Sequence, residues 1–321
     1  MTIEQILEDI RSPRVKKCIL DADMYNEMDD PYALGYCLTA DRIELLSVNA
    51  APFDNGRSAS YAQGVIDSYN ETLRVYEHCN IDIDKLPLYM GSDRKFSADD
   101  DFAPIDTPAA RNIIKTVKES DEIIYVITTG TCSNVASACL LDPSIKDNMC
   151  VIWLACREID YPECRDFNLA QDFVAGQHLF NCGVPLIWLP AAGGPESKGG
   201  TIQLYLTFEE LQNSIKGDGK AQKFFRDEFP AEFLPNEDGT PKIAEWDTLP
   251  NNQFGRALWD VGAPGLLCVP EAYDLEILPT PMICDNNTFA FDKTRHKLIY
   301  MRKLDKDVVL KDAFDCINKI K

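Results

Sequence analysis

The chain has 321 residues, of which 45% are apolar, so it can bury a large core, and its composition gives no sign of disorder. Its 52 acidic residues outnumber the 32 Lys and Arg residues, and the net charge of −20 would repel phosphate backbones and anionic lipids. We therefore expect neither nucleic acid nor a membrane surface among its partners.

The twelve cysteines are scattered through apparent strands and helices and form no CxxC pair, which is typical of reduced thiols in a core. Reduced thiols favour the cytoplasm. The segment 1–17 lacks the apolar stretch of a signal peptide, and no apolar run approaches the roughly eighteen residues of a membrane span. The sequence therefore predicts a cytoplasmic protein.

Short apolar runs alternate along the chain with longer segments of helical spacing. The runs predict strands at 16–21, 43–49, 122–128, 149–155, 185–190 and 264–269. The segments between them predict helices at 29–40, 57–80, 107–120, 133–141 and 170–182. This alternation indicates an α/β fold with a mostly parallel central sheet and helices on both faces. Such sheets carry their sites at the carboxyl ends of the strands.

Residues 191–256 interrupt this rhythm. They contain Gly pairs, helical pieces at 207–215 and 219–228, and a stretch rich in Pro and Asn that runs to 252. We interpret them as a helical insertion or lid within a single domain that spans 1–321.

Four aspartates surround the end of the first expected strand: Asp21 and Asp23 leave the strand, and Asp29 and Asp30 open the following helix. Acidic residues suit a helix N-terminus, so capping explains a pair of them. Four carboxylates at one strand end repel one another unless a cation lies among them. Because the neighbouring ligands would be oxygens, the sequence predicts Ca²⁺ or Mg²⁺ rather than zinc.

Two templates for such a site fit poorly. An EF-hand that starts at Asp21 needs Gly and Glu where this chain has Asn26 and Tyr32. A phosphatase of the haloacid dehalogenase type would have Thr or Val in place of Tyr25, with Asp21 as its nucleophile. The first template is excluded, and the second stays open as a Mg²⁺-dependent phosphohydrolase.

The stretch resembles the Asp-rich motif DxDxxxDDxxAL of the inosine-uridine preferring nucleoside hydrolase family. Here Asp21-x-Asp23 is followed by five residues instead of three, and then by Asp29-Asp30-x-x-Ala-Leu. The chain is similar to a branch of that family in which the motif is longer and carries Asn-Glu, here Asn26-Glu27, before the Asp pair.

Three further motifs of the family follow in order. The segment Thr131-Cys132-Ser133-Asn134 is similar to the family's turn GPLTN, Asp166-Phe167-Asn168 is similar to EFN, and Trp259-Asp260 lies where the family has its last metal-binding Asp. Together with the Asp-rich motif, these elements extend the resemblance over residues 15 to 270.

The resemblance implies Ca²⁺-dependent hydrolysis of the N-glycosidic bond of a ribonucleoside or a related ribosyl compound, with release of base and ribose, as in nucleoside salvage. The implied calcium ligands are the carboxylates of Asp23, Asp30 and Asp260 and the main-chain carbonyl of Ser133. Asp23 would also accept the proton of the attacking water. Asp21, Asn26 and Glu27 would support the site. Members of this family commonly form homodimers or homotetramers.

The resemblance also implies contacts with the sugar. Asp29 and Asn168 would bind the ribose hydroxyls, and Asp166 would reach the 5′-hydroxyl on an arm one methylene shorter than the usual Glu. Asp160 is a further candidate, because the family's next sugar-binding Asn cannot be aligned with this chain.

One departure concerns the leaving base. Many members have a His just before the last Asp as general acid, and this chain has Trp259 there. Some purine-preferring members stack the base on Trp, and a Trp packed in the core is the alternative. The three histidines, His78, His178 and His296, lie in segments that predict structural or surface positions. A protein that binds a nucleoside without turnover therefore also stays open.

Overall fold

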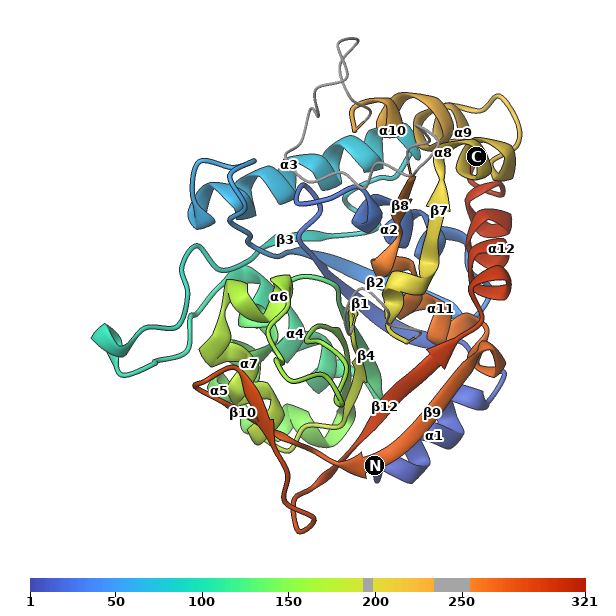
Figure 1. The fold of residues 1–321 in the computed structure, drawn as a ribbon. Coiled ribbons are helices and arrows are strands. Elements are labelled where there is room, and N and C mark those ends of the chain that lie inside the picture. The colour runs from blue at the N-terminus through green and yellow to red at the C-terminus, as the bar shows by residue number, and fades with distance from the viewer. Residues whose placement is uncertain (193–198, 234–254) are drawn as a thin grey trace.

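The computed structural model describes residues 1–192, 199–233 and 255–321. Its centre is an eight-stranded sheet with the strand order β3-β2-β1-β4-β5-β6-β12-β9 (Figure 1). All neighbours pair in parallel except β12 and β9, which are antiparallel. The strands are β1 Lys16–Ala22, β2 Ile43–Ala50, β3 Leu88–Met90, β4 Ile124–Thr128, β5 Met149–Leu154, β6 Leu186–Leu189, β9 Tyr273–Pro279 and β12 Lys297–Leu304.

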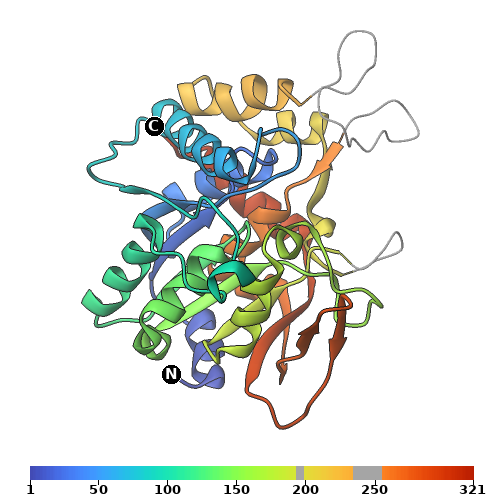
Figure 2. The same cartoon turned by 90° about the vertical axis from the view of Figure 1, so that its left-hand side faces the viewer.

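Helices cover both faces of the sheet, as Figures 1 and 2 show. One face packs against α1 Ile3–Arg11, α2 Asp29–Thr39, α11 Gly262–Cys268 and α12 Lys306–Ile317. The other packs against α4 Pro108–Glu119, α5 Ser133–Leu141 and α7 Phe173–Asn181. Successive strand residues alternate between the two cores, so Cys18 and Leu20 of β1 join the first and Ile19 joins the second. The predicted α/β class is confirmed.

Several helix starts follow from local sequence. Thr107 caps α4 through its hydroxyl, and Pro108 occupies the first turn, where its missing N–H costs nothing. Ser60 caps α3 Tyr61–His78, which lies beside β2 and β3. Asp172 caps α7 and separates it from the short helix α6 Phe167–Gln171, so the helix expected at 170–182 is two helices.

The region expected to form a helical insertion contains several short elements in its described part. These are η3 Thr201–Leu204, β7 Tyr205–Thr207, α8 Phe208–Ser214, α9 Lys220–Lys223, the π-helical turn Phe224–Glu228, α10 Phe229–Ala231 and β8 Gly255–Ala257. Strands β7 and β8 pair in antiparallel fashion, so residues 205–207 lie beside residues 255–257 at the end of the region. Residues 193–198 and 234–254, on which part of this expectation falls, lie outside the described residues. The single domain with a lid stays a prediction.

The prediction of a strand at 264–269 is wrong, because these residues lie mostly in α11. The apolar run Pro264–Cys268 is buried almost throughout, and periodicity cannot distinguish a buried strand from a buried helix. The last strands of the sheet are instead β9 and β12, and the hairpin β10 Met282–Cys284 and β11 Thr288–Ala290 lies between them. These elements and α12 were not predicted.

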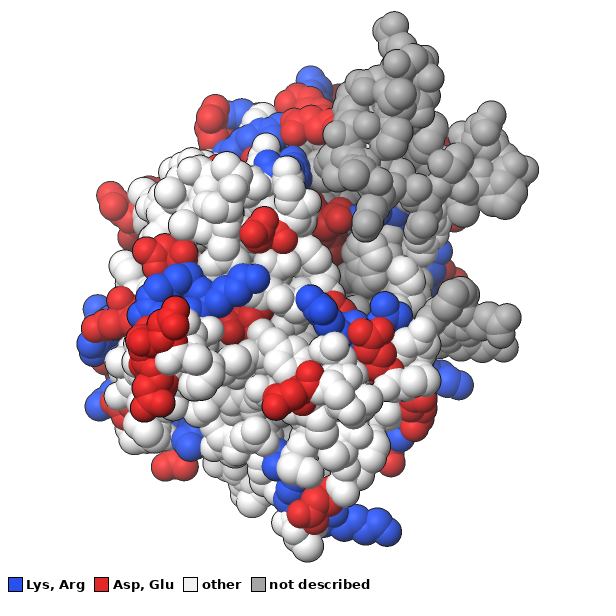
Figure 3. All heavy atoms as spheres, turned by 60° about the vertical axis from the view of Figure 1, so that its left-hand side comes forward, with Lys and Arg blue, Asp and Glu red and all other residues white. Residues whose placement is uncertain are grey.

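All twelve cysteines are free, and nine of them are buried. No helix among the described residues has the length and apolar character needed to cross a bilayer. On the face shown in Figure 3, the described Lys and Arg side chains are interspersed with Asp and Glu rather than gathered into one basic surface.

Candidate metal centre and active site

The site lies where the direction of the sheet connections reverses. From β1 the chain goes first to β2 on one side, and it later returns to β4 on the other side. The carboxyl ends of β1 and β4 therefore open a crevice of the kind in which open α/β sheets bind ligands. Asp21 is the penultimate residue of β1, and Asp23 directly follows the strand. On β4, Thr128 is in register with Asp21, and the N–H of the next residue, Thr129, donates to the Asp21 carbonyl at 3.0 Å.

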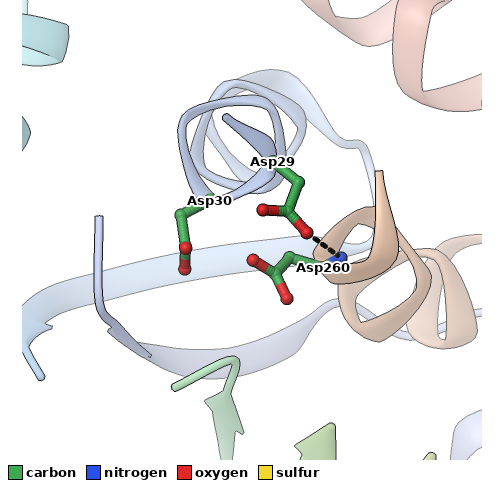
Figure 4. Close-up of side chains that lie close together, drawn as sticks. All are labelled: Asp29, Asp30 and Asp260. Atoms are coloured by element: carbon green, nitrogen blue, oxygen red, sulfur yellow. Dashed lines mark hydrogen bonds between the residues drawn. The ribbon is translucent and has the colours of Figure 1, made fainter. Parts of the chain in front are cut away.

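Three carboxylates meet beside this crevice. Asp29 and Asp30 begin α2, and Asp260 comes from the turn η5 Trp259–Val261, some 230 residues later. One oxygen from each lies within 4.8 Å of the others, and Figure 4 shows the three groups directed toward one another. The main-chain N–H of Asp260 donates to Asp29 Oδ2 at 3.2 Å, and Thr129 Oγ1 donates to Asp30 Oδ1 at 2.8 Å.

Asp23 joins this cluster from the β1 side. Its side chain is buried, and its Oδ2 has no hydrogen-bond partner among the described residues. Burial raises the pKa of Asp23 well above the usual value, and the charges of Asp30 and Asp29 raise it further. A Cβ at Gly130 would lie 2.9 Å from Asp23 Cγ, so this position has no room for a larger residue.

The donor chemistry of the cluster fits a hard divalent cation. Burial raises the pKa of Asp29 to about 8, with further contributions from Asp30 and Glu27, and burial with the neighbouring carboxylates raises that of Asp260. Four buried carboxylates with so few hydrogen-bond donors are costly without a counter-charge. Because every candidate ligand atom is an oxygen, Ca²⁺ or Mg²⁺ suits the cluster better than zinc.

Asp21 lies beside the cluster rather than within it. Its Oδ2 accepts hydrogen bonds from Asn49 Nδ2 at 3.2 Å and Asn134 Nδ2 at 3.1 Å. Burial raises its pKa to about 7. Asp21 thus ties the end of β1 to β2 and α5, and it does not line the pocket described below.

Ser133 begins α5, and its hydroxyl donates to Asp172 Oδ2 at 2.7 Å and contacts the Tyr61 hydroxyl at 3.0 Å. The side chain therefore anchors the turn after β4 to the start of α7. The role expected for Ser133 involves its carbonyl, and that role stays a prediction.

A pocket of about 240 Å³ opens onto the carboxylates. It brings together eight of the residues expected in the site, from three separate segments of the chain: Asp23, Asn26, Glu27, Asp29, Asp166, Asn168, Trp259 and Asp260. Thr129, Leu154, Phe167 and Ala191 complete its lining.

Asp160 is not part of the pocket lining, so the structure does not bring it to the site. Its side chain is 85% exposed and pairs with Arg302 of β12 at 2.9 Å. Asp160 lies in a surface turn after β5, and an exposed ion pair with a neighbouring strand accounts for its position.

Asn168 and Asp166 are held by α6 and the strand ends. Asn168 Nδ2 donates to the carbonyls of Thr129, at 2.5 Å, and Leu154, at 2.9 Å, which leaves Oδ1 as the group available to a ligand. Asp166 caps α6 by accepting from the Leu169 N–H at 3.0 Å, and burial raises its pKa to about 6. The shorter Asp arm therefore stabilises the helix that carries Asn168.

The loop between β1 and α2 is clamped by later segments. Asn55 Nδ2 donates to Asn26 Oδ1 at 2.7 Å, and Arg57 donates to the Tyr25 carbonyl at 2.7 Å while its guanidinium stacks on the Tyr25 ring at 3.9 Å. These contacts fix the part of the pocket wall that contains Asn26 and Glu27.

A second clamp comes from β8. Arg256 forms an ion pair with Glu27, and its guanidinium carbon lies 5.1 Å from the centroid of the Trp259 ring. Sequence reasoning missed Arg256 because nothing in its local pattern links it to residue 27. Thr129 was also missed, although its place directly after a buried strand is a signal for a site residue.

Comparisons with known proteins agree with this geometry. Residues 18–229 match the family described as inosine-uridine preferring nucleoside hydrolase. No curated protein matches the chain. A structure of a plant nucleoside hydrolase, the PpNRh1 enzyme, has a TM-score of 0.66 and 15% identity and covers 96% of this chain and 100% of its own.

Two bacterial structures are similar to the same extent. A purine-preferring ribonucleoside hydrolase from Gardnerella vaginalis has a TM-score of 0.68 and 18% identity, over 95% of this chain and 99% of its own. An inosine-uridine preferring nucleoside hydrolase from Bacillus anthracis has a TM-score of 0.64 and 15% identity, over 95% and 100%. At this identity the structures establish the shared fold, whereas the family match spans more than half of the chain. The chain therefore belongs to the inosine-uridine preferring nucleoside hydrolases, a family of metal-dependent enzymes that cleave N-glycosidic bonds.

Proposed function

We propose that this protein is a calcium-dependent hydrolase of ribonucleosides or closely related ribosyl compounds and releases free base and ribose. The observation that carries the proposal is the meeting of buried Asp23, Asp29, Asp30 and Asp260 at one end of a nucleoside-sized pocket. Their oxygens are the ligands that calcium prefers, and six to eight places around such an ion leave room for water and a sugar diol.

The proposed ligands are the carboxylates of Asp23, Asp30 and Asp260 and the carbonyl of Ser133. A calcium ion held there supplies Lewis acidity toward water and the ribose 2′- and 3′-hydroxyls. Asp23, with one oxygen free of protein hydrogen bonds, is the group that accepts the proton of the attacking water.

The remaining residues orient the sugar. Asp29 and the free Oδ1 of Asn168 would accept hydrogen bonds from ribose hydroxyls, and Asp166, which also lines the pocket, would reach the 5′-hydroxyl. Positive charge develops on the sugar as the glycosidic bond breaks, and the surrounding carboxylates stabilise that charge.

A panel of nucleosides, including inosine and uridine, tests the proposal through release of reducing sugar. We expect release in millimolar calcium, loss of release with a chelator, and recovery when calcium is restored. A protein that binds nucleosides in calorimetry but releases no sugar over long incubation would be the alternative non-catalytic binding protein. Release of phosphate from a phosphate ester, without release of base, would instead support a phosphohydrolase.

Two further properties belong to the proposal. The free cysteines support a reducing compartment such as the cytoplasm. We expect a homodimer or homotetramer, which light scattering coupled to size-exclusion chromatography measures directly.

A further inference from the structure

The turn after β4, formed by Thr129 and Gly130, contacts the carboxylate cluster and a residue expected to bind the sugar. The Thr129 hydroxyl donates to Asp30 Oδ1 at 2.8 Å, and the Thr129 carbonyl accepts from Asn168 Nδ2 at 2.5 Å. Gly130 lies against Asp23, because a Cβ at this glycine would be 2.9 Å from Asp23 Cγ. The turn therefore contacts two proposed ligands of the ion and one proposed ligand of the ribose.

The main chain of this turn is held from both neighbouring strands. The Thr129 N–H donates to the Asp21 carbonyl of β1 at 3.0 Å, and the Gly130 carbonyl accepts from the indole N–H of Trp153, in β5, at 3.0 Å. Trp153 is fully buried, so water does not compete for its hydrogen bond. The central sheet therefore sets the position of Thr129.

The Thr129 hydroxyl is directed at Asp30 in a site that excludes water. Both side chains are buried, and a β-branched side chain such as Thr has few directions open to it. The hydroxyl also lies 3.4 Å from the Asp21 carbonyl, but the Asp30 carboxylate is closer and can carry a charge. Hydrogen bonds to a charged acceptor are roughly twice as strong as neutral ones, so the hydroxyl donates to Asp30.

This hydrogen bond determines how Asp30 faces its neighbours. A donor to one carboxylate oxygen fixes the rotation of the group about its Cβ–Cγ bond, and with it the direction of both oxygens. Among the described residues, Thr129 is the one neutral side chain that donates to the Asp30 carboxylate. An oxygen of Asp30 lies within 4.8 Å of oxygens of Asp29 and Asp260, and like charges at this distance repel one another. The hydroxyl therefore holds Asp30 toward the cluster against that repulsion.

We propose that Thr129 is a positioning residue for the metal centre: its hydroxyl orients Asp30 as a ligand of the ion, and its carbonyl independently orients the Asn168 amide. This inference rests on the proposed calcium-dependent function and adds a residue to the site. Donors that orient metal ligands in this way typically contribute about 10- to 100-fold in metal affinity or activity.

Calorimetric titration of the chelator-treated, folded protein with calcium tests the role of the hydroxyl. Thr129→Val removes the hydroxyl but keeps the branched shape and the main chain, and it should raise the calcium dissociation constant by about 10- to 100-fold. Thr129→Ser keeps the hydroxyl and should bind calcium nearly as well as the wild type. The matched control is Thr128→Val, because the Thr128 hydroxyl is also buried at the end of β4 but has no hydrogen-bond partner among the described residues. It should leave the dissociation constant unchanged.

Kinetics on the nucleoside that the wild type cleaves best distinguishes the hydroxyl from the main chain of the turn. For Thr129→Val, kcat should be low at limiting calcium and should largely recover at saturating calcium. KM at saturating calcium should stay close to that of the wild type, because the contact with Asn168 uses the Thr129 carbonyl. A KM that stays raised at saturating calcium would show that the whole turn has moved, and it would contradict the specific role of the hydroxyl.

Two outcomes of the titration separate this inference from the proposed function. An unchanged calcium dissociation constant in Thr129→Val, even with a lower thermal midpoint, would overturn the inference and leave the function standing. Absence of calcium binding by the wild-type protein would remove both. If Thr129→Val does not fold, Thr129→Ala and Thr129→Ser make the same comparison, and equal dissociation constants for these two variants would overturn the inference.

Discussion

At the scale of single residues, Asp21 and Asp23 are separated by one position and have different surroundings. Each has one carboxylate oxygen without a hydrogen-bond partner among the described residues, but Asp21 accepts two amide hydrogen bonds and lies outside the pocket, whereas Asp23 lines it. Asp23→Asn should lower kcat for sugar release by about 10²- to 10⁴-fold, because the amide cannot accept the water proton and is a poorer metal ligand. Asp21→Asn should reduce kcat much less, with its effect seen mainly in thermal unfolding.

Asp23→Asn and Asp21→Asn also distinguish the nucleoside hydrolase hypothesis from the phosphohydrolase hypothesis. A phosphohydrolase with Asp21 as nucleophile would lose its activity in Asp21→Asn, so the order of the two effects would be reversed. Circular dichroism of both variants establishes that the fold is retained. Full activity of Asp23→Asn would contradict the proposed role of Asp23.

How well the site could be predicted differs from residue to residue. Asp29 and Asp30 were expected beside Asp23 because they follow the same strand, but the approach of Asp260 was expected only through the family resemblance. The contact between Arg256 and Glu27 joins positions 229 residues apart and leaves no local pattern. Asp160 was misplaced because a turn residue's direction depends on its neighbours, here Arg302.

At the scale of elements, the loop between β1 and α2 is the part of the site that depends most on other segments. Arg57, from the loop after β2, stacks on Tyr25 and on Phe233, and it donates to the Tyr25 carbonyl. Arg57→Lys keeps the charge and loses the planar stacking, so the pocket wall that contains Asn26 and Glu27 should loosen. We expect kcat/KM to fall by roughly tenfold, mainly through KM, because small misplacements of binding groups are costly.

Two measurements distinguish loosening of the loop from a general loss of stability. The thermal midpoint of Arg57→Lys should stay close to that of the wild type, and Arg111→Lys, which alters an exposed pair with Asp106, should change neither KM nor the midpoint. If kcat/KM and the thermal midpoint of Arg57→Lys fall together, Arg57 contributes only to the stability of the fold.

Helices and strands were predictable where the hydrophobic period of a segment and its length indicated the same kind of element. The helix expected at 133–141 coincides with α5, and the five strands expected before residue 191 all occur in the sheet. The helix α11 could not be distinguished from a strand because nearly all its residues are buried. Strands β9 and β12 escaped prediction because each has charged residues on its exposed positions and joins the sheet only through late, nonlocal pairing.

At the scale of the whole molecule, the carboxylate cluster links folding to metal binding. The cluster carries like charges that only the folded chain brings together, so the metal-free protein bears their repulsion. A ligand that binds only the folded state stabilises it by about 2.7 kcal/mol at a hundred times its dissociation constant. Calcium should therefore raise the thermal midpoint of the wild-type protein measurably.

The variant Asp260→Asn distinguishes two effects on the unfolding temperature, the repulsion among the carboxylates and the binding of calcium. Removing one charge relieves the repulsion, so the metal-free variant should unfold at the same temperature as the metal-free wild type or at a higher one, while its calcium response should largely disappear. Asp160→Asn removes a charge outside the pocket and should keep the full response. Scanning calorimetry of the three proteins, with calcium and with chelator, measures both effects. Because no other group of three acidic, His or Cys side chains among the described residues could hold the ion, we expect the response to depend on this cluster. An unchanged calcium response in Asp260→Asn would contradict the proposed site.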